Sequence, residues 1–264
     1  MIKVGDIEIG GGSLVFILGP CMMESKEMVM EIATTLKNTC PFPFIFKTSF
    51  DKANRSSINS DRGIGLEAGL SILEQIKYKL NLLTTTDIHL PEQAESVGAV
   101  CDMIQIPAFL CRQTDLLIAA ANTNKPVNVK KGQFLSPQDM KNVVEKIRNC
   151  GNSNILLTDR GTSFGYNNLI SDMRAIPIMK NLGCPVCFDA SHSVQCPGAF
   201  GDSSGGERQF TPTLAKAAVA AGADVIFIET HQNPEKAKSD SAIQWPLDKL
   251  LPLLKKLNDI YNIC

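Results

Sequence analysis

The fold that this sequence predicts is a (β/α)8 barrel, in which eight parallel strands alternate with eight helices. Eight short apolar runs each end in a polar or ionisable residue, and the segment after nearly every run has the pattern of a helix. The length of 264 residues is also close to the roughly 250 that are typical of such barrels. Because the C-terminal ends of all strands open on one face of a barrel, we expect residues 1–264 to form one domain with its chemistry on that rim.

Each apolar run leads to a candidate rim residue. In chain order, the runs and the residues that follow them are Leu14–Leu18 with Cys21, Phe44–Phe46 with Lys47, Leu82–Thr86 with Asp87, Met103–Ile104 with Gln105, Val127–Val129 with Lys130, Ile155–Thr158 with Asp159 and Arg160, Val186–Phe188 with Asp189 and His192, and Val225–Ile228 with Glu229.

The segments between the runs carry apolar residues three and four positions apart, which is the spacing of an amphipathic helix. The helices that we expect are Ser25–Lys37, Glu67–Lys79, Pro91–Val97, Arg112–Ala121, Ser136–Asn149, Ser171–Asn181, Thr213–Ala221 and Leu247–Asn258. Ser25 can cap the first helix, and Gly151, Gly183 and Gly222 follow three others, where a helix end often needs a positive φ.

The first twelve residues lie outside this repeating pattern. Ile2–Val4 and Ile7–Ile9 are short strand-like segments on either side of Gly5-Asp6, a turn-forming pair. We expect a β-hairpin here that closes the floor of the barrel, at the end opposite the rim.

Composition and charge exclude several classes of protein. A formal net charge of -1 argues against a general nucleic-acid or polyanion binder. The longest apolar stretches, Leu14–Leu18 and Leu116–Ala121, are far shorter than the about 20 residues that span a bilayer, and Met1–Gly12 has no pattern of a secretory signal. We therefore expect a cytoplasmic protein with no membrane partner.

The nine cysteines have no framework spacing, so we expect free thiols. Cys184 and Cys187 have the C-x-x-C spacing of redox and zinc motifs. However, they lie at the beginning of the seventh predicted strand, away from the rim. We expect both to be core residues.

Two connections on the predicted rim are longer than a minimal barrel needs. The first runs from Ser49 to Gly65 and is dense in cations and hydroxyl groups, and the second runs from His192 to Phe210 and is rich in glycine. Such loops are typical of lids that order over a substrate. Ordinary surface loops are the alternative.

The charged and soft residues of the rim fall into two sets. The cations are Lys47, Lys52, Arg55, Lys130 and Arg160, and together they suit a multiply anionic ligand such as a phosphate ester. The second set is Cys21, His192, Glu229 and Asp240, which suits a divalent transition metal such as Zn²⁺, Fe²⁺ or Mn²⁺. On spacing alone, a structural, hydrogen-bonded histidine is the commoner case.

A series of motifs over nearly the whole chain resembles the 3-deoxy-D-manno-octulosonate 8-phosphate synthases. The motifs are Gly19–Ser25, Phe46–Ser57, Thr86–His89, Gln105–Asp115, Asn128–Phe134, Phe188–Gln195 and Phe227–His231. The most specific part is Lys52-Ala-Asn-Arg-Ser-Ser57, because the related 3-deoxy-heptulosonate phosphate synthases carry a Lys-Pro-Arg-Thr-type run there. Cys21, with Ser239-Asp240 and Gln244, resembles the metal-dependent class, whereas the metal-independent class has asparagine at the Cys21 position.

The resemblance implies the condensation of phosphoenolpyruvate with D-arabinose 5-phosphate and water. The products are 3-deoxy-D-manno-octulosonate 8-phosphate, a precursor for lipopolysaccharide, and inorganic phosphate. It also implies a divalent metal held by Cys21, His192, Glu229 and Asp240, and a homotetramer in which Arg112 reaches the aldose phosphate of a neighbouring subunit.

The resemblance also implies how the site residues divide the work. Lys130 and Arg160, with backbone near Ala108 and Phe109, would hold the phosphate of phosphoenolpyruvate, while Lys47, Ser49, Lys52 and Gln105 would serve its carboxylate end. Asn54, Arg55 and Ser56 would bind the aldose phosphate, and Gln133 would contact substrate. Catalytic roles are implied for Lys47, Asp87, His192 and Asp240.

Three alternatives remain open at this point. A sister synthase that uses erythrose 4-phosphate or an N-acetylated hexosamine would keep the barrel and the metal, but the run Lys52–Ser57 disfavours it. A Schiff-base aldolase would use Lys47 or Lys130, and borohydride would trap its covalent intermediate. A non-catalytic metal-binding or scaffold protein would leave the converging cations without a purpose.

Overall fold

Eight parallel strands close into a barrel in the structure of this chain, a computed structural model that describes residues 1–55, 57–198 and 205–264. The strands are β3 (Val15–Gly19), β4 (Phe44–Lys47), β5 (Thr84–Asp87), β6 (Met103–Ile106), β7 (Val127–Lys130), β8 (Ile155–Asp159), β9 (Val186–Asp189) and β12 (Val225–His231). Each strand pairs in parallel with the next, and β12 closes the ring because it pairs with both β9 and β3. The predicted (β/α)8 barrel is confirmed.

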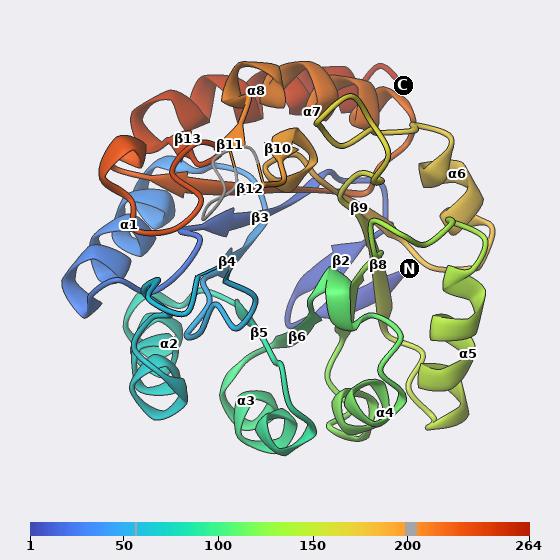
Figure 1. The fold of residues 1–264 in the computed structure, drawn as a ribbon, viewed down its shortest axis with the longest axis horizontal. Helices are drawn as coiled ribbons and strands as arrows, with labels where there is room; N and C mark the ends of the chain where they lie inside the picture. The colour runs from blue at the N-terminus through green and yellow to red at the C-terminus, as the bar shows by residue number, and fades with distance from the viewer. Residues whose placement is uncertain (56, 199–204) are drawn as a thin grey trace.

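Eight α-helices of the described residues surround the strands, and Figure 1 shows them as an outer layer around the ring. The helices are α1 (Lys26–Thr39), α2 (Leu66–Leu80), α3 (Ala94–Val100), α4 (Thr114–Asn122), α5 (Met140–Asn149), α6 (Ala175–Lys180), α7 (Thr211–Ala220) and α8 (Leu250–Tyr261). Outside the ring, the short strand β13 (Trp245–Pro246) pairs with the end of β12, and β10 (Gln195–Cys196) pairs with β11 (Gly205–Gly206).

Five helices, α3, α4, α5, α6 and α8, begin later than the sequence pattern predicts, and the difference is largest for α5 and α6. α5 begins at Met140 and not at Ser136, because the Ser136 hydroxyl donates to the Asp139 carboxylate at 2.7 Å and accepts from the Asp139 backbone at 3.3 Å, which makes a turn of these residues. α6 begins at Ala175 and not at Ser171, because the Asp172 carboxylate accepts from the Arg174 backbone at 3.0 Å. Short polar side chains therefore set both helix starts.

Helix α1 illustrates how the sequence fixes an element and its buried face. Its start is capped as predicted, since Ser25 Oγ accepts from Met28 N at 3.2 Å, a contact worth about 1 kcal/mol. Val29, Ile32 and Leu36 lie on one side of the helix and are buried against the barrel, where each contributes about 1.5–3 kcal/mol.

The floor of the barrel is closed by the predicted N-terminal hairpin of β1 (Ile2–Val4) and β2 (Ile7–Ile9). Figure 1 shows the hairpin within the ring of strands. Its buried side chains pack with Val15 and Val225, the first residues of β3 and β12, so the hairpin lies at the N-terminal end of the strands. Gly5 makes the turn with a φ of 57°, a conformation that favours glycine. The other end of the barrel is left for the site.

The cysteine pair near the floor has the expected core role. Cys184 and Cys187 are free and buried, and Cys187 belongs to the same apolar cluster as the hairpin. Within the three described ranges of the chain, no helix is long and apolar enough to cross a membrane.

Candidate active site

The C-terminal ends of the strands open into two adjoining cavities. The first has a volume of about 340 Å³, and its wall includes Lys47, Asp87, Gln105, Ala108 and Lys130. The second has a volume of about 360 Å³, and its wall includes Arg55, Gln195, Ser239 and Asp240. Both cavities are lined by Lys52, Asn54, Phe109, Gln133, Arg160 and His192. Side chains from distant parts of the sequence thus converge on the rim, as predicted.

The two rim lysines on β4 and β7 are each held by one buried carboxylate. Lys47 Nζ lies 2.7 Å from Glu229 Oε1 and also donates to the carbonyl oxygen of Cys21 at 2.9 Å. Burial would lower the pKa of Lys47, but the nearby carboxylates outweigh it and the pKa is raised. Lys130 Nζ lies 2.6 Å from Asp189 Oδ2 and 3.8 Å from the centre of the Phe227 ring. Both lysines are therefore placed as fixed cations.

The guanidinium groups of Arg160 and Arg55, by contrast, keep donors without partners among the described residues. Arg160 is 6% exposed, and its Nη2 donates to Gln195 Oε1 at 2.5 Å, while its Nη1 is buried with no hydrogen-bond partner among the described residues. Arg55 donates to Ser239 Oγ at 2.8 Å and to the Lys238 carbonyl at 2.6 Å, but its buried Nε has no described partner. A buried unpaired donor costs about 1–3 kcal/mol, so each guanidinium group is suited to bind an anion by donating to it.

Asp87 accepts two hydrogen bonds inside the first cavity. Ser49 Oγ donates to its Oδ2 at 2.6 Å, and Gln105 Nε2 donates to its Oδ1. Burial alone would raise the pKa of this carboxyl, but Lys47 and Lys52 outweigh it and hold the pKa well below its usual range. Asp87 is therefore an ionised acceptor in the site.

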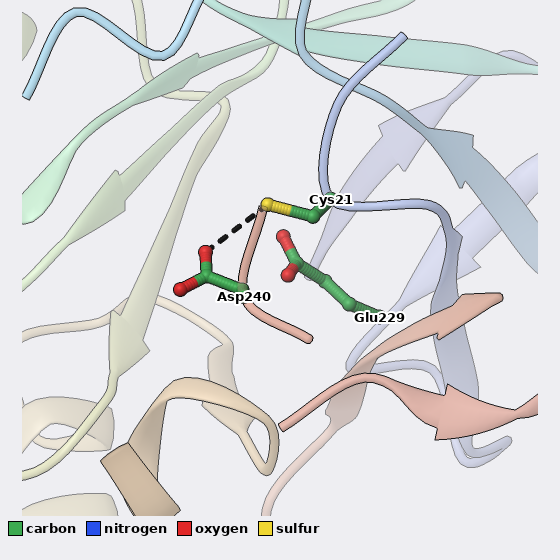
Figure 2. A group of neighbouring side chains, drawn as sticks. All are labelled: Cys21, Glu229 and Asp240. Atoms are coloured by element: carbon green, nitrogen blue, oxygen red, sulfur yellow. Dashed lines mark hydrogen bonds between the residues drawn. The ribbon is translucent and has the colours of Figure 1, made fainter. Parts of the chain in front are cut away.

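Three of the four expected metal ligands form a tight group, and Figure 2 shows their side chains pointing toward one another. The candidate ligand atoms of Cys21, Glu229 and Asp240 all lie within 4.8 Å of one another, with 3.0 Å between Cys21 Sγ and Asp240 Oδ2. His192 borders the group, since its Nε2 lies 3.7 Å from Glu229 Oε1 and 3.8 Å from Asp240 Oδ2. The sequence-based ligand set is thus brought together, with the histidine slightly farther out.

The chemistry of this group fits a divalent transition metal. Glu229 Oε2 is buried with no hydrogen-bond partner in the described part of the chain, which leaves a lone pair for an ion. His192 Nδ1 lies 2.7 Å from Asp189 Oδ2, the kind of carboxylate contact that orients a metal-binding imidazole. Burial, together with Asp240 and Glu229, raises the pKa of Cys21 well above its usual value, so the free thiol keeps its proton. A bound cation would favour the thiolate.

The remaining predicted residues are placed as follows. Asn54, Ala108, Phe109 and Gln133 line the cavities. Arg112 is exposed and lines neither cavity, so any role at a neighbouring subunit stays a prediction. Ser56 lies outside the described residues. The same holds for residues 199–204 of the second long loop, and the predicted lid role of both loops stays a prediction.

Two positioning contacts were not predicted. Gln195 joins both halves of the site, because it accepts from Arg160 and donates to Asp240 Oδ1 at 2.9 Å. Asp189 contacts both Lys130 and His192 through one oxygen. The sequence predicts Asp189 as a rim residue but not its two partners, and Gln195 is predicted only as the last residue of the motif Phe188–Gln195.

The parallel barrel carries fixed cations, two guanidinium groups with unpaired donors, and a cluster of one thiol and two carboxylates on its rim. These features define an enzyme that acts on multiply anionic small molecules. Comparison with known proteins then gives the family. The model described as the DAHP synthetase I family matches residues 1–263, and the chain belongs to this family.

Several curated relatives match nearly the full length of the chain and share one name, 2-dehydro-3-deoxyphosphooctonate aldolase. The protein of Protochlamydia amoebophila is 57% identical over 98% of this chain and 97% of that relative. The protein of Geobacter sp. is 54% identical over 98% and 96%, and that of Brucella anthropi is 53% identical over 97% and 94%, respectively.

Proposed function

We propose that this chain condenses phosphoenolpyruvate with D-arabinose 5-phosphate and water to give 3-deoxy-D-manno-octulosonate 8-phosphate and inorganic phosphate. The relatives named 2-dehydro-3-deoxyphosphooctonate aldolase support this activity. The structural observation that carries it is the pair of guanidinium groups, Arg160 and Arg55, whose unpaired donors belong to adjoining cavities. Two anionic groups on two substrates fit this arrangement better than a single phosphate does.

The charges of the site support a division between the two substrates. Arg160 and Lys130 hold the phosphate of phosphoenolpyruvate, and Lys47, Lys52, Ser49 and Gln105 hold its carboxylate end. Arg55 and Asn54, with Ser56 by resemblance, hold the phosphate of the aldose in the second cavity. In this division C3 of phosphoenolpyruvate would face the aldehyde carbon where the two cavities adjoin.

The chemistry then follows in three steps. C3 of phosphoenolpyruvate attacks the aldehyde carbon, and C2 becomes oxocarbenium-like. Water adds to C2, and the resulting hemiketal phosphate expels inorganic phosphate. Lys47 and Lys130 stabilise the negative charge on the reactant, since both are fixed by buried carboxylates and need no reorganisation. Asp87 keeps Ser49 and Gln105 oriented as their hydrogen-bond acceptor.

Cys21, Glu229 and Asp240, together with His192, hold a divalent transition metal in this proposal, and Zn²⁺, Fe²⁺ and Mn²⁺ all suit the donor set. When bound, such an ion supplies Lewis-acid polarisation of the aldehyde or activation of the attacking water. Burial would raise the pKa of Asp240, but Lys52 and His192 outweigh it and lower the pKa, so the carboxylate stays ionised for this role.

The proposal extends to assembly and cellular role. A homotetramer is implied by the resemblance, and a contact surface between subunits is supported by Phe134, Phe164 and Ile170, which are 52%, 94% and 47% exposed and line one open groove beside the rim. Arg112 would reach the site of a neighbouring subunit in this assembly. By resemblance the enzyme works in the cytoplasm and supplies a lipopolysaccharide precursor. Sedimentation of the purified chain tests the tetramer.

A Schiff-base aldolase is the main chemical alternative, and the geometry disfavours it. Its nucleophile must be a neutral amine, but Lys47 and Lys130 are each within 2.7 Å of a buried carboxylate oxygen. Borohydride with substrate should therefore leave no covalent adduct on the protein.

The direct test is phosphate release from phosphoenolpyruvate with a panel of aldose phosphates. Arabinose 5-phosphate should be required, and erythrose 4-phosphate should be much poorer, because Arg55 and Asn54 must reach a phosphate at a fixed distance from the aldehyde. Equal rates with both aldoses would refute the proposed substrate.

A further inference from the structure

A continuous series of buried hydrogen bonds links neighbouring strands on the inner side of the barrel, beneath the first cavity. Thr158 Oγ1 donates to Asn128 Oδ1 at 2.6 Å, and Asn128 Nδ2 donates to Gln105 Oε1 at 3.1 Å. Gln105 Nε2 donates to Asp87 Oδ1, and Ser49 Oγ donates to Asp87 Oδ2 at 2.6 Å. We call these five residues the interior network. Only its Asp87 and Gln105 line the first cavity.

The register of the sheet places the members side by side. Asp87 on β5 pairs with Gln105 on β6, and Gln105 pairs with Asn128 on β7. Side chains two residues apart on a strand point to the same face. Asn128 therefore lies directly beneath Lys130, the cation assigned to the phosphate of phosphoenolpyruvate, and the network continues the site downward into the barrel.

The charge of Asp87 determines which group donates and which accepts in each hydrogen bond between the carboxylate, Gln105, Asn128 and Thr158. An ionised carboxylate can only accept, so Gln105 must present Nε2 to it and leave Oε1 facing β7. Asn128 must then present Nδ2 to Gln105 and leave Oδ1 for the Thr158 hydroxyl. Reversal of either amide would set two acceptors or two donors against each other, which is costly in a buried site.

We propose that Asn128 and Thr158 are positioning residues that hold the Gln105 amide in the orientation needed to bind phosphoenolpyruvate. Both side chains are fully buried, and neither lines a cavity, so they act through Gln105 and not on the substrate. Without Asn128, Oε1 of Gln105 loses its donor, and the amide is held by its bond to Asp87 alone. The inference rests on the proposed function, which assigns Gln105 to the carboxylate end of phosphoenolpyruvate.

The test is a mutant cycle read by calorimetric titration with phosphoenolpyruvate alone. Asn128→Leu keeps a similar volume and removes both amide contacts, and its dissociation constant for phosphoenolpyruvate should rise about tenfold, the effect of one hydrogen bond of about 1.4 kcal/mol. In a Gln105→Leu background, Asn128→Leu should change the dissociation constant by less than about twofold, because the group through which it acts is gone.

Thr158→Val keeps the shape of the side chain and removes the hydroxyl that donates to Asn128, so it also serves if Asn128→Leu does not fold. It should weaken phosphoenolpyruvate binding about threefold. Thr86→Val is the matched control, because Thr86 is an equally buried strand threonine whose hydroxyl has no hydrogen-bond partner in the described ranges. It should leave the dissociation constant unchanged, and thermal unfolding of each variant checks the fold.

Two results would overturn the proposal. One is a dissociation constant for phosphoenolpyruvate within twofold of wild type in every folded variant of Asn128 and Thr158. The other is a loss of phosphoenolpyruvate affinity on Asn128→Leu that is equally large in the wild-type and Gln105→Leu backgrounds. A wild-type protein that binds phosphoenolpyruvate but releases no phosphate with any aldose phosphate would refute the proposed function alone. A wild-type protein that does not bind phosphoenolpyruvate would refute both.

Discussion

Replacement of Arg160 by methionine should separate the two anion sites. Methionine fills much of the same volume but removes the guanidinium, including the unpaired Nη1. If this group binds the phosphate of phosphoenolpyruvate, the variant loses a charge-assisted hydrogen bond worth about 1.5–3 kcal/mol, which corresponds to an increase of about 10- to 150-fold in the Michaelis constant. The Michaelis constant for arabinose 5-phosphate should change by less than about threefold, since Arg55 remains.

The same substitution should cost little stability in the absence of substrate. Removal of a buried unpaired donor relieves about 1–3 kcal/mol, and loss of the hydrogen bond to Gln195 costs about 1 kcal/mol. We therefore expect the free energy of unfolding of the ligand-free variant to lie within about 1–2 kcal/mol of wild type. The stabilisation that phosphoenolpyruvate gives to the wild-type protein should be largely lost.

The assay is steady-state phosphate release with each substrate varied in turn, combined with thermal unfolding with and without phosphoenolpyruvate. Arg174→Met is the matched control, because its side chain is 84% exposed in an ion pair with Asp172 on the surface. It should change neither Michaelis constant. An Arg160→Met variant that raises the constant for arabinose 5-phosphate and spares that for phosphoenolpyruvate would show that the pockets are reversed.

Three further predictions test the rest of the site. Arg55→Met should raise the Michaelis constant for arabinose 5-phosphate about 10-fold or more and spare that for phosphoenolpyruvate; an unchanged constant for the aldose would contradict the assignment. A strong chelator should remove activity, and divalent transition ions should restore it. Cys21→Ala should bind little metal by elemental analysis, whereas Cys21→Asn should keep weak, chelator-resistant activity; full activity of wild-type protein stripped of metal would contradict the ligand set. Because the pKa of Asp87 is lowered by folding, its contribution to stability is complete above about pH 5 and is lost as the pH falls. The difference in free energy of unfolding between wild type and Asp87→Asn, measured in urea, should narrow toward pH 3, and a widening difference would refute this sign.

The barrel could be predicted because most strands are rich in apolar residues and a polar residue lies at or just after the C-terminal end of nearly all of them. That pattern identified Lys47, Asp87, Lys130 and Glu229 as rim residues without any knowledge of contacts. The helix starts were less predictable, because side-chain hydrogen bonds such as that of Ser136 compete with the first helical turn.

The pairing of charges across the barrel could not be predicted from the sequence. Lys130 is the last residue of β7 and Lys131 follows it, yet Lys130 pairs with Asp189 in the site and Lys131 pairs with Asp159 at 3.2 Å. Nor does the pattern reveal that Arg55 and Arg160 each keep a buried nitrogen without a hydrogen-bond partner among the described residues. Such partners depend on strand register and on distances between loops, which a local pattern does not contain.

The hairpin at the floor has a consequence for redesign of this barrel. Its side chains and the first inward residues of the strands form a dry, apolar layer at the floor, and this layer meets the ionised layer of the rim at Phe227, whose ring lies 3.8 Å from Lys130 Nζ. Volume-conserving exchanges in the dry layer, at Ile2, Val4 or Ile9, alter packing alone and typically cost less than about 1.5 kcal/mol. Stability and catalysis can therefore be varied independently, by substitution at opposite ends of the same eight strands.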